Sequence, residues 1–360
     1  MKKLLFLILL LAPCVCRAQP KYNGFSFPTW WRDSYESADA AASLKQMAEA
    51  GADSVAIIPT WYMDDSKSSS MAAKDGTASD ASLQKIMQAA RGLKMQVILK
   101  PHVDISAGGA RAWIEPKDPE AWFKSYREFI LHYARMARDE KADMFVVGTE
   151  LTTMSRSAYT AKWEGLIKEI KAIYGGPLTY ASNWYDYKDV EFWKSLDFIG
   201  IDGYFSMNKG PSLAQLKEGW QEHIPGLKAA AAKYGKSILF TEMGIPCKKG
   251  AEKEPWNYLI KGDVDVQLQS DYFQAFLDVF SKESYYAGFL QWNWELDPKA
   301  GGPKDGSMTV QNKPALDVLK AYFKSLKAPA SQPATPKKSA MKLPEDRIDA
   351  VLRTTSFDHQ

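Results

Sequence analysis

Two short stretches of this 360-residue sequence end in the pair Thr-Glu, and their glutamates are the residues best suited to chemistry. In residues 144–151, four apolar residues lead through Gly-Thr to Glu150; in residues 237–246, three apolar residues lead through Thr to Glu242. Apolar runs of this length are typical of buried strands. Two strands that each deliver a carboxylate predict one pocket that holds both.

A pair of carboxylates can act on one bond, one as general acid and the other as nucleophile. Glycosidic hydrolysis uses such a pair: a protonated carboxyl group releases the leaving oxygen, and an ionised one meets the oxocarbenium-like centre. A single glutamate after a strand is equally explained as a first-turn acid favoured by the helix macrodipole. Two of them, Glu150 and Glu242, each preceded by Thr, favour the paired role. Their separation, which decides between retention and inversion, does not follow from sequence.

The elements that must position these glutamates follow from the pattern of apolar residues. Strand-like runs occupy residues 23–27, 54–59, 96–100, 144–148, 178–182, 198–202, 238–241 and 288–292. Segments with apolar residues three and four apart indicate helices, and they occupy residues 38–50, 81–92, 122–136, 158–173, 213–234, 266–280 and 314–325. Strand-like and helix-like segments therefore alternate along the chain.

This alternation predicts an α/β fold and, within that class, one (β/α)8 TIM barrel of eight strand-helix pairs, residues 19–326. Continuous apolar runs such as Val-Ala-Ile-Ile at residues 55–58 suit a parallel sheet covered on both faces. A doubly wound sheet is the alternative, but no glycine-rich fingerprint follows the first strand. In the barrel, the strands ending in Glu150 and Glu242 lie three apart, so both side chains can project across one mouth.

Most of the tryptophan also falls at strand ends. Four of the twelve lie in helix-like segments and are predicted to pack in the core: Trp122, Trp163, Trp193 and Trp220. The other eight fall at strand ends or in the loops that follow: Trp30, Trp31, Trp61, Trp113, Trp184, Trp256, Trp292 and Trp294. Aromatic faces stack on sugar rings, so this distribution suits a sugar cleft. The alternative is that these rings seal the top of the barrel.

Polar residues accompany the aromatic ones. The third strand ends in Lys-Pro-His-Val-Asp, which places His102 and Asp104 near the mouth. The fifth and sixth strands are followed by Asn183 and Tyr204. Lone strand-end carboxylates, for example Asp202, are more often structural ion pairs than catalysts.

Metal and cofactor sites are not indicated by the residue types. The sequence has four His and no cysteine cluster, so a zinc site built on His102 and Asp104 is not expected. The acidic pair Asp64 and Asp65 leaves a calcium site in that loop open. We predict no metal and no cofactor.

The first 18 residues have the layout of a secretory signal peptide. Two lysines precede an apolar run at residues 4–12, which is too short to span a bilayer, and cleavage is expected after Ala18. A lipoprotein signal that ends at Cys14 is the alternative, but Pro13 stands where a small residue is expected. We therefore predict a secreted or periplasmic protein. At the other end, residues 327–360 are rich in Pro, Ala and Lys and predict a flexible extension.

Charge and cysteine content limit the partners. The sequence has 46 basic and 43 acidic residues, and removal of the signal peptide takes away three basic residues and leaves the counts equal. A neutral chain gives no indication of nucleic-acid binding. Cys247 is the only cysteine beyond the signal peptide, so no internal disulfide is expected. We predict no nucleic-acid partner and no membrane span, and the sequence leaves the oligomeric state open.

Several motifs together resemble a known family. Phe-Pro-Thr-Trp near the start, Lys-Pro-His-Val-Asp, Val-Gly-Thr-Glu-Leu, Gly-Ile-Asp-Gly-Tyr-Phe and Phe-Thr-Glu-Met-Gly-Ile-Pro are similar to family 113 of the glycoside hydrolases. That family belongs to clan A, and its characterised members are β-mannanases. The resemblance covers roughly residues 22–323 and omits both ends.

The resemblance implies retaining double displacement on a polysaccharide or oligosaccharide. Glu150 would be the acid/base and Glu242 the nucleophile, with Tyr204 donating to the nucleophile and Trp292 forming the floor of the −1 sugar site. Further hydroxyl or stacking contacts are expected from Trp30, Trp61, His102, Asp104, Asn183 and Trp184. Most clan members carry Asn before the acid/base, whereas Thr149 stands here. This difference is compatible with the axial 2-hydroxyl of mannose, but it leaves the substrate open.

Two alternatives to an endo-β-1,4-mannanase remain at this point. A glycosidase with the same machinery could act on another β-linked glycan, such as a glucan or galactan, and the shape of the pocket would decide. A non-catalytic glycan-binding barrel could keep the fold without the reaction. The presence of both Glu150 and Glu242 argues against this second alternative.

Overall fold

The computed structural model describes residues 21–327. The predicted signal peptide and Cys14 lie outside the described residues. So does the predicted C-terminal extension apart from Lys327, which ends the last helix.

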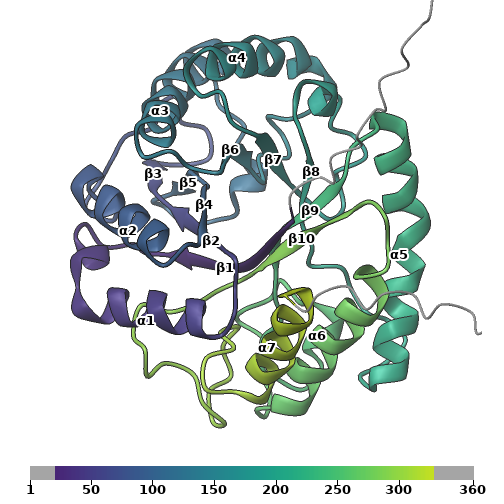
Figure 1. Ribbon diagram of the computed structural model, residues 1–360. Helices are drawn as coiled ribbons and strands as arrows, with labels where there is room; N and C mark the ends of the chain where they lie inside the picture. Colours follow the sequence, from purple (N-terminus) through teal and green to yellow (C-terminus); the bar gives the residue numbers. More distant parts are fainter. Residues whose placement is uncertain (1–20, 328–360) are drawn as a thin grey trace, which may run out of the picture. The chain divides into compact units, whose positions relative to one another are not determined.

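Eight parallel strands close into a barrel in the order β1, β10, β9, β8, β7, β6, β4, β2, with the helices around it (Figure 1). The strands are β1 (Tyr22–Pro28), β2 (Ser54–Ile58), β4 (Gln96–Leu99), β6 (Met144–Thr149), β7 (Leu178–Asn183), β8 (Ile199–Asp202), β9 (Ile238–Met243) and β10 (Tyr286–Gln291). The predicted TIM barrel is confirmed, and each of its eight strands overlaps a predicted run.

All seven predicted helices are present. They are α1 (Ala38–Glu49), α2 (Asp80–Gly92), α3 (Pro119–Asp139), α4 (Thr160–Ile173), α5 (Leu213–Tyr234), α6 (Val266–Phe280) and α7 (Pro314–Lys327). Five begin at a Ser or Asp whose side chain accepts a hydrogen bond from a first-turn backbone N–H, which supplies a partner that the helix itself lacks. These caps are Ser37, Ser79, Asp118, Ser212 and Asp265.

The expectation of eight complete strand-helix pairs was wrong at one place. Between β7 and β8 the chain forms the 3-10 helix η4 (Phe192–Ser195) and no α-helix. The reason lies in two large aromatic residues of η4, Phe192 and Trp193, which are both fully buried. Phe192 stacks on Trp163 of α4, with ring centroids 5.1 Å apart. These rings cover the strands where a helix would otherwise lie.

A second, smaller sheet stands beyond the barrel strands and was not predicted. It pairs β3 (Thr60–Met63) with β5 (His102–Ile105) in parallel register. Each follows a barrel strand after a proline, Pro59 or Pro101, and proline cannot donate to a sheet ladder. The two strands therefore continue past the barrel as a separate pair, which raises His102 and Asp104 above the mouth.

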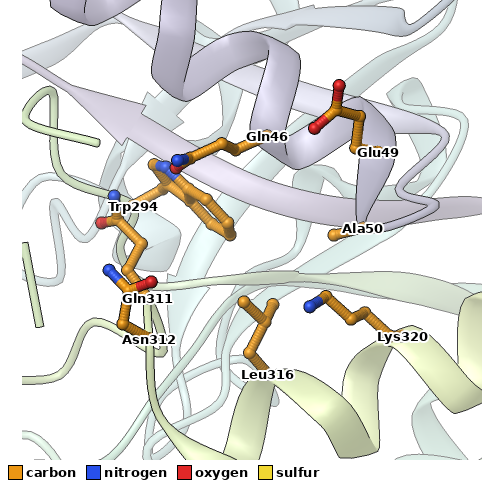
Figure 2. Close-up of a pocket in the computed structure, with 8 residues that line it drawn as sticks. All are labelled: Gln46, Glu49, Ala50, Trp294, Gln311, Asn312, Leu316 and Lys320. Carbon is orange, nitrogen blue, oxygen red and sulfur yellow. The ribbon is translucent and has the colours of Figure 1, made fainter. Parts of the chain in front are cut away.

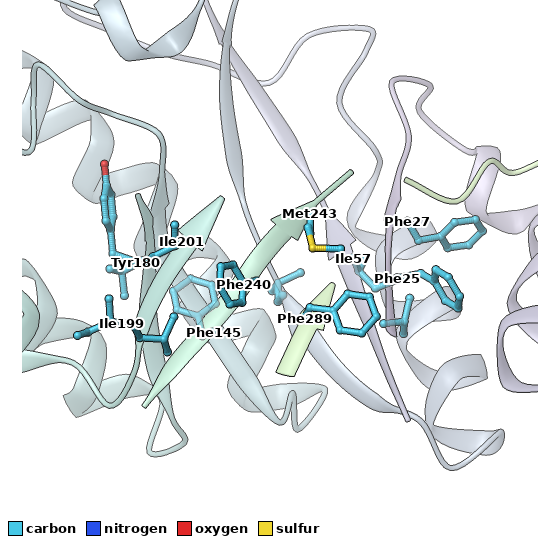
Figure 3. Close-up of a cluster of buried hydrophobic side chains, with 14 of the residues drawn as sticks. Phe25, Phe27, Ile57, Phe145, Tyr180, Ile199, Ile201, Phe240, Met243 and Phe289 are labelled. Carbon is cyan, nitrogen blue, oxygen red and sulfur yellow. The ribbon is translucent and has the colours of Figure 1, made fainter. Parts of the chain in front are cut away.

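Two groups of apolar side chains alternate along the barrel strands. Figure 3 shows part of the outer group, which packs beneath the helices and includes Phe25, Ile57, Phe145 and Phe240. The inner group comprises Tyr22, Ala56, Ile98, Met144, Val146, Ala181, Phe198, Leu239, Ala287 and Leu290. Its members alternate with outer residues along each strand, so they fill the barrel interior. The four tryptophans predicted as core, Trp122, Trp163, Trp193 and Trp220, are all fully buried.

Candidate active site

The alternation that places apolar side chains inside the barrel also places polar side chains at the carboxyl ends of the strands. Side chains two residues apart on a strand share a face. Residues two positions after an interior residue therefore point into the mouth of the barrel. They are Lys100 after Ile98, Asn183 after Ala181, Thr241 after Leu239 and Trp292 after Leu290.

Glu242, on β9, lies in a buried network of donors and is 4% exposed. The ammonium group of Lys100 donates to Oε1 of Glu242 and lies 3.2 Å from the carboxylate of Asp202. The hydroxyl of Tyr204 donates to Oε2 of Glu242 at 2.8 Å. Both oxygens of Glu242 therefore have a donor, an arrangement that suits an ionised carboxylate.

Burial also raises the pKa values of two acidic groups beside Glu242, Tyr204 and Asp202. Burial and the charge of Glu242 raise the pKa of the Tyr204 hydroxyl well above its ordinary value, so this phenol keeps its proton and stays a donor. Burial, with Glu242, also raises the pKa of Asp202, while Lys100 opposes the increase. The hydroxyl of Thr241 donates to Asp202 at 2.7 Å.

Glu150 follows β6 in an unusual backbone conformation. Its φ is +53°, in the left-handed region, which costs a residue other than glycine about 1–3 kcal/mol. Its backbone N–H donates to the carbonyl oxygen of Ala181 at 2.7 Å, which holds the turn. Two positions earlier, a Cβ on Gly148 would lie 2.9 Å from the hydroxyl of Tyr126 and 3.0 Å from the ring of Trp163. The Gly-Thr-Glu sequence thus lets β6 pass close to the helices before it turns Glu150 into the mouth.

The two glutamates influence each other. Burial and the charge of Glu242 raise the pKa of Glu150 to about 7, while Arg111 and Lys100 act to lower it. The nearest cation to Glu150 is Arg111 of η2 (Arg111–Trp113), with Nη1 3.6 Å from Oε2 of Glu150. Near neutral pH a large share of Glu150 therefore holds a proton, as a general acid requires.

His102 and Trp292 lie beside Glu242. The two rings stack at 6.0 Å between centroids with an interplanar angle of 11°. Nε2 of His102 is 3.7 Å from Oε1 of Glu242. Asp104, two residues along β5, accepts from Arg111 at 2.5 Å and connects this group to Glu150.

Asn183 and Trp184, which end and follow β7, also lie at the site. Thr152 lies two residues after Glu150, and its hydroxyl accepts a hydrogen bond from the amide of Asn183 at 3.0 Å. Trp184 meets Tyr204 edge to face at 5.9 Å and stacks on Trp256 at 4.9 Å. The structure therefore brings together Glu150, Glu242, His102, Asp104, Asn183, Trp184, Tyr204 and Trp292.

Trp61 does not lie beside the glutamates. Its indole N–H donates to the hydroxyl of Tyr133 at 3.0 Å, and its ring packs 5.4 Å from Phe129, so it faces helix α3. Tyr62, the next residue, lies opposite Asp104 in the register of the small sheet, so their side chains are on the same face. Trp61 is therefore not among the side chains gathered around the two glutamates, and its part in substrate binding stays a prediction.

The remaining tryptophans divide between exposed and buried positions. Trp30, in the loop after β1, is 43% exposed, and Trp31 and Trp113 are more so. Trp294 is 1% exposed and packs 4.6 Å from Phe25. It lines a pocket of about 210 Å³ between α1 and α7 (Figure 2). Trp294 is therefore a packing residue, as the alternative to a sugar cleft allows for these rings.

Two cations of the site were missed by sequence analysis. Lys100 carried a usable signal, because it stands two residues after the apolar Ile98 and shares its inward face. Arg111 carried none, since it lies in a loop whose path no periodic pattern defines.

Residues 21–327 contain neither a cluster of metal ligands nor a helix suited to span a membrane. No three His, Cys, Asp or Glu side chains come together there as a metal site. In the loop considered for calcium, Asp64 pairs with Lys74 at 2.6 Å, and Asp65 accepts from the backbone N–H of Lys67 at 2.8 Å. None of the helices in this part of the chain has both the length and the apolar character needed to cross a membrane.

A parallel eight-stranded barrel with two glutamates at the ends of strands three apart is the architecture of a barrel glycoside hydrolase. Comparison with known families narrows this class. The sequence profile of Glycoside Hydrolase Family 113 matches residues 25–313, most of the chain, and the protein belongs to that family.

Solved structures of the family agree with this assignment. A complex structure of a GH113 β-1,4-mannanase is 29% identical, with a TM-score of 0.78 over 85% of this chain and 100% of the other. The GH113 β-mannanase of Alicyclobacillus acidocaldarius, in complex with ManMIm, is 26% identical, with a TM-score of 0.79 over 86% of this chain and 98% of the other. A comparison with curated proteins finds no match. The protein is thus a glycoside hydrolase that resembles β-mannanases.

Proposed function

We propose that this glycoside hydrolase cleaves β-1,4-mannosidic bonds in mannan-type polysaccharides by a retaining double displacement. The observation that carries the proposal is the contrast between the two glutamates of the site. Glu242 accepts hydrogen bonds from Lys100 and Tyr204. Glu150 has a pKa raised to about 7. One carboxylate is prepared to attack, and the other is prepared to give up a proton.

In the first step a carboxylate oxygen of Glu242 attacks the anomeric carbon, and the bond from that carbon to the glycosidic oxygen breaks. Glu150 transfers its proton to the departing oxygen, so the leaving sugar departs as an alcohol. The product of this step is a glycosyl ester on Glu242. Lys100 and Tyr204 hold the attacking group in one orientation throughout.

The second step reverses the role of Glu150. Ester formation removes the negative charge of Glu242, which is one cause of the raised pKa of Glu150. The pKa of Glu150 therefore falls, and its carboxylate takes a proton from water as the water oxygen attacks the anomeric carbon. The same attack breaks the bond between the anomeric carbon and Glu242, which leaves as a carboxylate, and the proton taken from water leaves Glu150 protonated for the next cycle.

The proposed substrate is supported by the related solved structures and by the aromatic side chains of this chain. The two related structures described above carry the names β-1,4-mannanase and β-mannanase. In this chain, Trp292 beside Glu242 supplies a flat face for the sugar in the reacting position. Exposed rings such as Trp30 and Trp113 supply further faces for a longer glycan.

The test is product analysis on linear mannan, glucomannan, cellulose and galactan, with Glu242→Gln and Glu150→Gln in parallel. We expect short manno-oligosaccharides from the wild-type protein, and a loss of several orders of magnitude in turnover in both variants. Activity confined to glucan or galactan would keep the barrel and discard the substrate. Substantial activity in either variant would overturn the assignment of its glutamate.

The two variants should also differ from each other. Glu242→Gln cannot form the glycosyl ester, so no substrate rescues it. Glu150→Gln keeps the nucleophile, so aryl glycosides with acidic leaving groups should still form the ester. Mass spectrometry of the intact protein after a short incubation with a dinitrophenyl β-mannobioside would show the added sugar only in Glu150→Gln.

We also propose that the protein is exported, on the basis of the N-terminal sequence. The lysine-led apolar run before Ala18 supports secretion or transfer to the periplasm. N-terminal sequencing of the protein from the culture medium or periplasm tests this proposal. A mature chain that begins at Gln19 is expected, and a mature chain with a lipid-modified Cys14 at its start would favour the lipoprotein alternative.

A further inference from the structure

Arg111 connects three parts of the site that the sequence treats as separate. Its Nη2 donates to Asp104 at 2.5 Å, and its Nη1 donates to Nδ1 of His102 at 2.9 Å. The same Nη1 lies 3.6 Å from Oε2 of Glu150. Only 17% of the Arg111 side chain is exposed. A guanidinium fork with three contacts in one pocket is fixed in place, because it can rotate only by breaking them together.

The contact with His102 determines which imidazole nitrogen carries the proton. A guanidinium group has donors only, so Nδ1 of His102 must accept. The proton of the neutral ring is then on Nε2, which points toward Oε1 of Glu242 at 3.7 Å. Among residues 21–327, Nε2 has no hydrogen-bond partner. Burial, with Arg111 and Lys100, also keeps the pKa of His102 well below its ordinary value, so the ring stays neutral.

We propose that Arg111 is a positioning residue that holds Glu150 in its proton-donating geometry and fixes the tautomer of His102 beside Glu242. This inference rests on the proposed function, since it assigns Arg111 a part in the reaction that Glu150 and Glu242 perform. Arg111 itself touches neither the attacking nor the leaving atom in that scheme. It acts through Glu150 and His102.

The charges around Glu150 predict what removal of Arg111 does. Burial and the charge of Glu242 are the largest influences on the pKa of Glu150, and both raise it. Arg111 lowers this pKa more than Lys100 does, and Asp186 raises it slightly. The other ionisable groups nearby are His102, whose ring stays neutral, and the acidic groups Asp104, Tyr185, Asp202 and Tyr204. Without Arg111, the anion of Asp104 also loses its partner. The pKa of Glu150 therefore rises in Arg111→Gln, and Glu150 keeps its proton to higher pH.

The first measurement needs no substrate. The carboxyl carbon of Glu150 is followed by ¹³C NMR during a pH titration, and its signal is assigned by its loss in Glu150→Gln. We expect the midpoint to rise by about one pH unit in Arg111→Gln, as for loss of one adjacent opposite charge. Arg111→Lys keeps the charge and should keep the midpoint close to that of wild type. An unchanged midpoint in Arg111→Gln would overturn the inference.

The second measurement separates positioning from general damage. The value of kcat/KM is compared for mannopentaose, whose leaving group needs a proton, and for dinitrophenyl β-mannobioside, whose leaving group does not. If Arg111 positions the acid, Arg111→Gln should lose about 100-fold on mannopentaose, within the usual range of general acid catalysis, and only a small factor on the aryl substrate. Equal losses on both substrates would show a merely structural role.

Two controls keep this inference apart from the proposed function. Glu150→Gln must show the same division between substrates, more strongly; if it does not, the assignment of the acid/base fails, whatever Arg111 does. A wild-type protein inactive on both mannosides would overturn the proposed substrate, while the NMR titration would still decide the role of Arg111. Thermal unfolding and Arg111→Lys, which should lose less on mannopentaose than Arg111→Gln, guard against a misfolded variant.

Discussion

Glu242 and Glu150 end strands three apart on one barrel, yet their surroundings differ. Both oxygens of Glu242 accept hydrogen bonds from buried side chains, Lys100 and Tyr204. Glu150 has one cation 3.6 Å away, and its backbone is in the left-handed region. One glutamate is part of the packed interior of the barrel, whereas the other stands on a strained turn at its edge.

This difference matches the tasks proposed for the two groups. A nucleophile must meet one carbon atom from one direction, and rigid donors fix that approach. An acid/base must gain and lose a proton in each cycle, so its charge must respond to its neighbours. Four carboxylates lie beside Lys100 or Arg111, and the placement of the two cations separates the roles: Lys100 touches Glu242, and Arg111 faces Glu150.

The largest effect on this comparison is expected from Lys100→Met. The change leaves Glu242 and Asp202 buried together without their cation, and breaking a buried ion pair in this way costs about 3–5 kcal/mol. The free energy of unfolding, measured by guanidinium denaturation at pH 7, should fall by that amount. Activity should be lost as well, because the carboxylate of Glu242 loses the donor to Oε1.

The matched control is Lys217→Met. Lys217 pairs with Asp278 on the surface, where both side chains are 35% exposed, and such pairs contribute about 1 kcal/mol or less. The two lysine variants should therefore differ clearly in stability. A similar small loss in both would contradict the view that Lys100 holds the buried charges of the Glu242 region together.

A smaller effect is expected from Tyr204→Phe, which removes only the donor to Oε2 of Glu242. Hydrogen bonds to charged groups contribute about 1.5–3 kcal/mol, so kcat should fall by about 10- to 150-fold. The control on the Glu150 side is Tyr185→Phe. The hydroxyl of Tyr185 lies 3.3 Å from that of Thr152, and the residue is 47% exposed, so water can replace it. Its loss should change kcat by about threefold or less, and equal losses in the two variants would remove the contrast.

Much of the fold could be predicted because the barrel strands are continuous apolar runs and the helices have a clear spacing. The parts that could not be predicted are short and lack either signal. Strands β3 and β5 have four residues each and follow a proline, which looks in sequence like the end of a strand. Between β7 and β8 the short helix η4 stands where an α-helix would complete the pattern. Its residues Phe192 and Trp193 are buried through contacts with α4 that the local sequence does not reveal.

The residues of the site also divide into those that the sequence could predict and those that it could not. Glu150 and Glu242 could be predicted because each follows a run of apolar residues and a Thr, near the carboxyl end of a strand. Lys100 could have been predicted from its register with Ile98, but a lysine in a barrel strand was not treated as a candidate. Arg111 could not, because the loop before α3 reaches Glu150 through tertiary contacts alone.

The smallest effect is expected from Trp61→Phe, which tests where sequence and structure disagree. On a four-residue strand, a shift of one position exchanges the two faces, so the sequence could not choose between Trp61 and Tyr62. Because Trp61 packs on α3, Trp61→Phe should leave kcat/KM for mannopentaose within about twofold of wild type. Trp292→Phe, the same substitution beside Glu242, should lower kcat/KM about tenfold through loss of ring stacking. A loss of kcat/KM with Trp61→Phe as large as that with Trp292→Phe would mean that the Trp61 face of β3, and not the Tyr62 face, meets the glycan.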